Sequence, residues 1–304
     1  MNEERISQIV RHEISVVIPT VGRSILRRCL QSISEGNELP GRLVVVDQSS
    51  NREIADWLGL LKSSGVDTRY VASRQTGRAS GVNRGLEQAK GQFVAITDDD
   101  CLVAKDWLQR MFMHLEQSPD TVMTGRVEAG GDGQVPFTVT SASPEIYRRP
   151  RLKFDALSGG NMGVSQSVLE KVGLLDEDPI LRCSEDGEWA YRALRAGVPI
   201  EYAPDIVVYH YGWRDSEQSR EQYRNYARSC GGFYGKYIGR GDWFIGARAL
   251  IHYLRELRRF VKASLTGNRK HVQMSWACLR WLIPGIYSGL KTSSAKGSDK
   301  RERT

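Results

Sequence analysis

The chain has 304 residues, 40% hydrophobic and 26% charged, which is enough for a globular domain with a sizeable core and a further segment. Its five cysteines are scattered without a Cys-x-x-Cys pair, which argues against a disulfide framework or a zinc site and favours free thiols in a reducing cytoplasm. No signal peptide is visible, and no run reaches the roughly 18 apolar residues of a membrane-spanning helix.

Short apolar runs and amphipathic segments alternate over the first hundred residues. The runs predict strands at residues 14–18, 43–46, 66–72 and 92–96, and the amphipathic segments predict helices at 24–33, 52–61 and 79–89. This alternation predicts a parallel sheet with helices on both faces, whose ligands bind beyond the carboxyl ends of the strands.

The pattern continues less regularly to residue 210. We expect helices at 106–114, 167–172 and 187–196, and strands at 121–128 and 206–209. A turn is predicted at 130–133, followed by a loop with little periodicity up to residue 150.

Three adjacent carboxylates, Asp98, Asp99 and Asp100, follow the apolar run at 93–97. Like charges at the end of a buried strand repel one another and require a cation to offset them. The triplet therefore predicts a nucleotide diphosphate held through a divalent ion. An acidic surface turn is the alternative.

Several signatures occur in a fixed order and together resemble the inverting family 2 glycosyltransferases of the GT-A fold, of bacterial rhamnosyl or polysaccharide type. They are Val16 to Thr20, Val46 to Ser50, Gly77 to Gly85, Asp98 to Asp100, Gly159 to Met162, and Glu185-Asp186. The resemblance implies a Rossmann-like α/β fold with a mixed, mostly parallel sheet, and transfer of a sugar from a UDP-, dTDP- or GDP-linked donor.

The resemblance also implies a metal and a donor site. It places Mn²⁺ or Mg²⁺ on Asp100 and the nucleoside near Asp98, with Asp99 in the same motif. His210 resembles a histidine that completes the metal shell in some relatives, although a lone histidine is more often structural. Further donor-binding candidates are Pro19, Thr20, Asp47, Gln48, Arg78 and Asn83.

Two of these candidates have alternatives. Many relatives carry two adjacent aspartates where this chain has Asp47-Gln48, so recognition of the base is altered or shifts to Asp47. Arg78 suits phosphate through its planar guanidinium, but a solvated helix face also explains it.

Asp186 is the candidate catalytic base, since sugar transfer requires removal of the acceptor proton. Acidic residues after Ser184 also stabilise the start of a helix, and only the resemblance favours the catalytic role. Glu185, Gly160 and Asn161 are expected near the donor sugar and acceptor. Trp189 either stacks on an acceptor sugar or packs in the core.

The last third of the chain is basic. Residues 212–304 hold 19 Lys and Arg against 7 Asp and Glu, which predicts an anionic partner. Apolar residues at helical spacing over 245–261, with arginines largely opposite, followed by a Trp-bearing segment at 272–283 that ends at Pro284, fit a peripheral helix on an anionic membrane. Docking on the catalytic domain or a second subunit is the alternative. Nucleic-acid binding is disfavoured, because the aromatic residues follow the apolar stripe.

These inferences define three regions and one activity. We expect a catalytic domain at residues 1–212, a basic amphipathic helical region at 213–292 and a disordered tail at 293–304. The predicted enzyme transfers a hexosyl or rhamnosyl group to a glycan or lipid-linked acceptor at the inner face of the cell membrane. A sugar-phosphate nucleotidyltransferase and a non-catalytic membrane- or glycan-binding protein are the rival interpretations.

Overall fold

The computed structural model describes residues 8–49, 51, 53–131, 138–152, 157–212 and 216–301. The chain divides into two compact units. The sheet unit comprises Met1–Arg149, Ala156–Leu175 and Trp189–Trp213, and the helical unit comprises Pro150–Asp155, Asp176–Glu188 and Arg214–Thr304. The short segment from Asp176 to Glu188 therefore groups with the C-terminal helices, although it lies between two parts of the sheet unit in the sequence.

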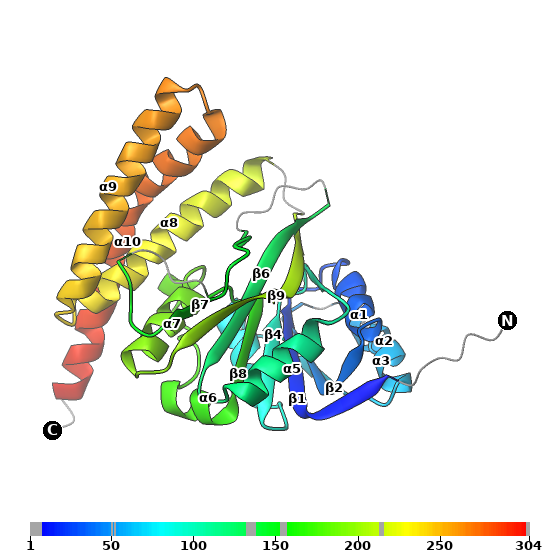
Figure 1. Ribbon diagram of the computed structural model, residues 1–304. Helices are drawn as coiled ribbons and strands as arrows, with labels where there is room; N and C mark the ends of the chain where they lie inside the picture. The colour runs from blue at the N-terminus through cyan, green and yellow to red at the C-terminus, as the bar shows by residue number, and fades with distance from the viewer. Residues whose placement is uncertain are drawn as a thin grey trace. The chain divides into compact units, whose positions relative to one another are not determined.

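The sheet unit is built on one nine-stranded sheet in the order β3-β2-β1-β4-β8-β6-β9-β5, with β7 paired to β9 (Figure 1). The strands are β1 (Ile9–Thr20), β2 (Glu38–Asp47), β3 (Asp67–Ala72), β4 (Phe93–Thr97), β5 (Cys101–Val103), β6 (Val122–Gly130), β7 (Glu145–Tyr147), β8 (Asn161–Ser165) and β9 (Ile200–Tyr211). The first half is parallel, and β8 runs antiparallel to both β4 and β6.

Helices cover both faces of this sheet. They are α1 (Leu26–Ser34), α2 (Ile54–Trp57), α3 (Gly59–Ser63), α4 (Arg78–Leu86), α5 (Trp107–Gln117), α6 (Gln166–Val172) and α7 (Glu185–Arg195), which begins in the helical unit. Neighbouring residues of a strand point to opposite faces, so Val16 packs in one core with Leu30, and Val17 packs in a second core with Val82. The mixed α/β sheet with helices on both faces confirms the predicted GT-A fold class.

The second half of the sheet contains three strands that the sequence did not indicate: β5, β7 and β8. No strand was predicted in the glycine-rich segment at 158–163, but Asn161–Ser165 forms a fully buried strand between β4 and β6. Its Asn161 and Gly163 have low strand propensity, and the pairing with two neighbours outweighs it. The turn predicted at 130–133 lies partly outside the described residues.

Three long helices make up most of the helical unit. They are α8 (Ser216–Ile238), α9 (Trp243–Leu265) and α10 (Arg269–Arg301), with a 3₁₀ turn, η1 (Pro179–Leu181), against α8. The α8 helix lies within the region 213–292 that we expected to be helical, but the sequence pattern did not locate it as a separate helix. In addition, α10 continues through Pro284, where we expected an end, and through residues 293–301, where we expected disorder. Among the described residues, no helix is both long and apolar enough to cross a membrane.

Glycines bring α8 and α10 into close contact, which explains why α10 does not stop at Pro284. A Cβ on Gly231 would lie 2.1 Å from the carbonyl oxygen of Leu282, and one on Gly285 would lie 2.2 Å from that of Arg228. The Gly285-x-x-x-Gly289 pattern therefore forms a backbone-to-backbone interface. Packing along this interface offsets the hydrogen bond that a proline removes from a helix.

The α9 helix buries several polar residues and exposes many of its apolar residues. Glu256 is 4% exposed and accepts hydrogen bonds from Ser275 (3.0 Å) and Arg259 (2.8 Å), while His252 lies 3.0 Å from the hydroxyl of Tyr234. The opposite pattern is usual for a surface helix in water. The exposed apolar side chains of α9 include Trp243, Leu250, Leu254, Leu257, Val261 and Leu265.

Two helical glycines test the close contact between α8 and α10. A Cβ on Gly235 would lie 2.0 Å from the carbonyl oxygen of Ile286, so we expect Gly235→Ala to lower the free energy of unfolding by about 1–3 kcal/mol. The control is Gly246→Ala in α9, where a Cβ meets nothing within 4 Å; it should raise that free energy by about 0.5–1 kcal/mol. Denaturant unfolding measures both, and equal effects of the two substitutions would contradict the packing.

Candidate active site

The carboxyl ends of the central parallel strands bring the predicted polar residues to one edge of the sheet. Thr20 ends β1 and pairs in register with Asp47, which ends β2. Asp98 to Asp100 follow β4, which pairs with β1 on its other side. Strand register alone therefore accounts for this gathering.

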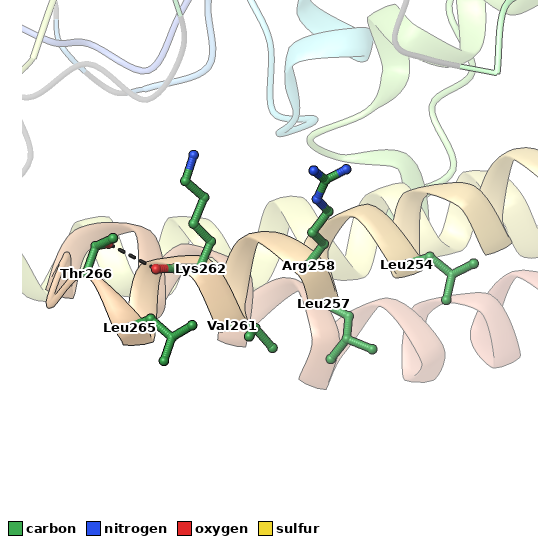
Figure 2. Close-up of a pocket in the computed structure, with 7 residues that line it drawn as sticks. All are labelled: Leu254, Leu257, Arg258, Val261, Lys262, Leu265 and Thr266. Carbon is green, nitrogen blue, oxygen red and sulfur yellow. Dashed lines mark hydrogen bonds between the residues drawn. The ribbon is translucent and has the colours of Figure 1, made fainter.

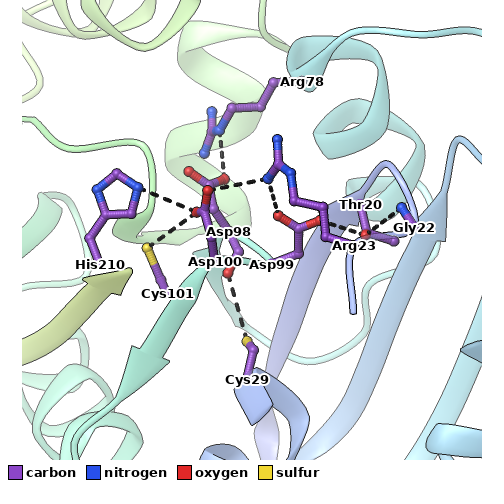
Figure 3. Close-up of polar contacts among 10 residues, drawn as sticks. All are labelled: Thr20, Gly22, Arg23, Cys29, Arg78, Asp98, Asp99, Asp100, Cys101 and His210. Carbon is purple, nitrogen blue, oxygen red and sulfur yellow. Dashed lines mark hydrogen bonds and ion pairs between the residues drawn. The ribbon is translucent and has the colours of Figure 1, made fainter. Parts of the chain in front are cut away.

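Each aspartate of the triplet has different partners (Figure 3). Asp98 accepts a hydrogen bond from Nε of Arg78 at 2.7 Å. Asp99 accepts one from the hydroxyl of Thr20 at 2.6 Å and one from Arg23 at 2.5 Å.

Asp100 lies between Arg23 and His210. Its Oδ2 is 3.2 Å from the Arg23 guanidinium, and its Oδ1 is 3.5 Å from Nε2 of His210. The ladder between β5 and β9 brings the histidine here, because Cys101 pairs in register with His210. Two arginines and one histidine thus surround the charge that made the triplet conspicuous.

Burial distinguishes Asp98 from the other two carboxylates. The side chain of Asp98 is 28% exposed, whereas those of Asp99 and Asp100 are 2% and 6% exposed. Desolvation, offset only in part by Arg23, raises the pKa of Asp99 to about 6. Asp99 therefore holds Thr20 and Arg23 in place from within, while Asp98 is the most accessible of the three.

The possible metal ligands at this edge of the sheet suit a divalent cation that binds together with a substrate. Across the described parts of the chain, no group of three or more His, Cys, Asp and Glu side chains forms a ready-made metal site. One carboxylate and one imidazole, on Asp100 and His210, nevertheless lie side by side. Mn²⁺ and Mg²⁺ in nucleotide sites take few protein ligands and complete their shells with water and phosphate oxygens, so these two residues fit such an ion.

Asp47 and Gln48, which we predicted to bind the nucleotide-sugar, are hydrogen-bonded to other residues of the protein. Asp47 is fully buried and accepts hydrogen bonds from the backbone N–H of Ser49 (2.8 Å) and the hydroxyl of Tyr70 (2.8 Å). The hydrogen bond to Asp47 raises the pKa of Tyr70. Gln48 donates to the carbonyl oxygens of Gln75 and Gly77, each at 2.8 Å, and so fixes the loop that leads into α4.

The glycine-rich segment lies close against the side chains of Arg78 and Asp98. A Cβ on Gly159 would lie 2.8 Å from the guanidinium of Arg78, and one on Gly160 would lie 2.9 Å from Oδ2 of Asp98. Asn161 is fully buried, with its Oδ1 accepting from the indole of Trp107 at 2.9 Å. The two glycines therefore pack against the side chains of Arg78 and Asp98.

Three predicted residues make buried contacts with the protein itself. The side-chain amide of Asn83 donates to the carbonyl oxygen of Leu175 at 2.9 Å and accepts from its N–H at 3.0 Å. Trp189 is fully buried, and its indole N–H donates to the carbonyl oxygen of Gly173 at 2.7 Å. For Trp189 this matches the packing alternative. Pro19 is also buried, with a Cβ on Gly81 reaching within 2.7 Å of it.

Glu185 and Asp186 belong to the helical unit, in the first turn of α7. Glu185 is buried, and Asp186 is partly exposed with its Oδ1 accepting from the N–H of Gly187 at 2.7 Å.

Sequence reasoning did not identify Arg23 and Tyr70 as site residues. Arg23 bridges Asp99 and Asp100, and Tyr70 holds Asp47. Arg23 follows Thr20 closely in the strand-to-helix loop, which was the available signal. Tyr70 gave none, because its alignment with Asp47 depends on the register between β2 and β3.

The buried Asp99 predicts a specific pH dependence. Its folded pKa of about 6 lies above the ordinary 3.8, so the stability due to this proton is present at low pH and lost as pH rises from about 4 to about 6. Asn resembles the protonated form. In EDTA, Asp99→Asn and wild type should have similar free energies of unfolding at pH 4, and the variant should be more stable by up to about 3 kcal/mol above pH 6. A difference that is the same at pH 4 and pH 7 would contradict this assignment.

Known proteins with similar sequences include a glycosyltransferase. The glycosyltransferase AglE of Haloferax volcanii is 25% identical over 226 residues, which cover 69% of this chain and 71% of AglE. Other curated relatives are longer, and the match spans only 24–26% of their length.

Solved structures share the fold at low sequence identity. The mannosyltransferase PcManGT from Pyrobaculum calidifontis, in complex with GDP-Man and Mn²⁺, has a TM-score of 0.63 and 16% identity, covering 92% of this chain and 87% of that one. TarS 1-349 of S. aureus, in complex with UDP, has a TM-score of 0.54 and 15% identity, covering 91% and 92%.

The family follows from the sequence match itself. The family model described as glycosyl transferase family 2 matches residues 15–173, which contain the strand ends, the aspartate triplet and the glycine-rich segment. With more than half of the 304 residues matched and the GT-A architecture in place, this chain belongs to glycosyl transferase family 2.

Proposed function

We propose that the protein is a metal-dependent, inverting glycosyltransferase that moves a hexosyl or rhamnosyl group from a nucleotide-diphospho-sugar to a hydroxyl of a glycan or lipid-linked acceptor. One observation carries the proposal: the aspartate triplet lies at the carboxyl edge of the sheet among Arg23, Arg78 and His210. Anionic and cationic groups together suit a ligand that brings both a diphosphate and a divalent ion.

On the donor side, Asp100 and His210 would hold Mn²⁺ or Mg²⁺, which when bound offsets the charge that develops on the leaving diphosphate. The PcManGT complex with Mn²⁺ supports this choice of ion. Asp98, the exposed carboxylate, would contact the nucleoside. Arg78 already pairs with Asp98 and has the planar guanidinium that binds phosphate oxygens, so it would serve the diphosphate.

The base pocket would centre on Asp47. Gln48 donates to two backbone carbonyls and orders the loop, so in this proposal Asp47 and its partner Tyr70 are the residues that would recognise the base. A carboxylate and a phenol can together bind a uracil, thymine or guanine edge. UDP-, dTDP- and GDP-sugars are therefore the donors to test, and the complexes with GDP-Man and UDP in the two solved structures support that range.

Asp186 would act as the base. An ionised carboxylate within hydrogen-bond reach of the acceptor hydroxyl can take its proton as the oxygen attacks the anomeric carbon. Attack from the side opposite the leaving diphosphate inverts that carbon. The partial exposure of Asp186 is compatible with access by an acceptor, in contrast to the buried Glu185 and Glu188.

The outer face of α9 supports a membrane-bound acceptor. Leu254, Leu257, Val261 and Leu265 are between 43% and 84% exposed and project from the same side of the helix (Figure 2). Arg258 and Lys262 leave the helix beside them and line the same surface depression. An apolar stripe bordered by basic side chains suits an anionic lipid surface, whereas two copies of the stripe would bring like charges together. The enzyme would then act as a peripheral protein at the inner face of the cell membrane.

The division of labour between two aspartates tests the proposed chemistry. Release of nucleoside diphosphate is measured with UDP-glucose, dTDP-rhamnose and GDP-mannose, using water as the acceptor. We expect Asp100→Ala to abolish Mn²⁺-dependent donor binding. Asp186→Asn should keep donor affinity and lose about 10²–10⁴-fold in turnover, the usual contribution of a general base.

Two comparisons make this test specific. The exposed Asp120 provides matched controls, Asp120→Ala and Asp120→Asn, which should behave as wild type. Azide is an anionic acceptor that needs no deprotonation, so its reaction should survive Asp186→Asn. Undiminished release to water in that variant would rule out Asp186 as the base.

Membrane binding is tested with vesicles. Wild type should sediment with phosphatidylglycerol-containing vesicles at low salt and be released as salt rises, because the basic side chains are screened. Leu254→Gln with Leu257→Gln should weaken binding at all salt concentrations, and Leu60→Gln, at an exposed leucine of the sheet unit, should not. Association of wild type into dimers that the double substitution dissociates, with no vesicle binding, would instead assign the stripe to a second copy.

A further inference from the structure

One face of α8 is occupied by the chain segment that leads to Asp186. Ser229, Gly232 and Lys236 recur at positions i, i+3 and i+7, so they lie along the same side of the helix. All three contact the segment Asp176–Glu188, which belongs to the same compact unit. These contacts therefore lie within one compact unit.

The middle of the segment lies directly on the α8 backbone. The hydroxyl of Ser229 accepts a hydrogen bond from the N–H of Cys183 at 3.0 Å. One turn further, a Cβ on Gly232 would lie 2.2 Å from Cγ1 of Ile180, so only glycine leaves room for η1. Here the segment can neither rotate nor lift without losing a hydrogen bond and a close packing contact.

Both ends of the segment are held by charge. Lys236 is 3% exposed and forms an ion pair with Asp176, and its Nζ is 3.6 Å from Oε1 of Glu188. The hydroxyl of Tyr237 donates to the same Glu188 oxygen at 2.6 Å. A buried carboxylate needs such partners, and the need fixes where Glu188, which is 1% exposed, can lie.

Fixing Glu188 also fixes Asp186. The two residues are two positions apart on α7, and at about 100° per residue their side chains point to nearly opposite sides of the helix. When Glu188 points into α8, Asp186 must point away from it. The burial of Glu188 and the partial exposure of Asp186 agree with this rotation.

We infer that Lys236 and Tyr237 are positioning residues for the Asp186 carboxylate, acting through Glu188, and that α8 is therefore part of the catalytic apparatus. The inference rests on the proposed role of Asp186 as the base. The C-terminal helices would then have a second role besides membrane binding, because they hold the first turn of α7 in one orientation about the helix axis.

The test compares reactions that do and do not need a base. In Lys236→Met, release of nucleoside diphosphate to water should fall about 10–100-fold, the cost of a misplaced catalytic group. Donor KM and the reaction with azide should stay within about twofold of wild type. Tyr237→Phe removes one hydrogen bond and should show the same pattern to a smaller extent. Lys291→Met, at an exposed lysine of the same unit, is the matched control.

Each outcome decides the inference. Wild-type release to water in a folded Lys236→Met protein overturns it, as does an equal loss of the water and azide reactions, which indicates general damage. If Lys236→Met does not fold, Tyr237→Phe decides by the same two reactions, at a melting temperature close to that of wild type. Asp186→Asn is run in parallel: if it retains release to water, the proposed base has failed, whereas loss there combined with no effect of Lys236→Met and Tyr237→Phe refutes the positioning role alone.

Discussion

The sheet edge that carries the candidate active site depends on the charge of three adjacent carboxylates at the end of β4. Arg23 pairs with two of them, Arg78 pairs with the third, and His210 lies beside Asp100. Gly159 and Gly160 lie against this arrangement: a Cβ at either position would displace the end of the Arg78 or Asp98 side chain. Asp98 is the most accessible of the three carboxylates, and in our proposal Asp98 and Asp100 meet a donor and its ion.

In the helical unit, too, buried carboxylates have polar partners. Lys236 satisfies two acidic residues of the Asp176–Glu188 segment, and Glu256 is satisfied by Ser275 and Arg259. Because Arg248, His252 and Glu256 of α9 are buried, much of its apolar surface is left outside. In our proposals, the contacts of α8 set the turn that carries Asp186, and the exposed apolar surface of α9 meets a membrane.

The sequence predicted what depends on local pattern and missed what depends on distant pairing. Apolar runs located β1 to β4, and their order with the following polar residues indicated the family. No strand was predicted at β8, because Asn161 and Gly163 have low strand propensity, and only the pairing with β4 and β6 makes them a strand. The α8 helix lies in the region expected to be helical but was not located individually, because its glycines disfavour a helix until α10 packs on them. Arg23 became a site residue only when the register of β1 and β4 was known.

A calorimetric titration of the full chain with UDP-, dTDP- and GDP-sugars, performed in Mn²⁺ and again in EDTA, tests the central claim most directly. The charge arrangement around Asp100 predicts that one donor class binds in Mn²⁺ and that its affinity falls at least about tenfold in EDTA, a loss of roughly 1.4 kcal/mol or more. Equal affinity in both conditions, or no binding of any donor, would contradict a metal-dependent sugar-nucleotide site at the end of β4.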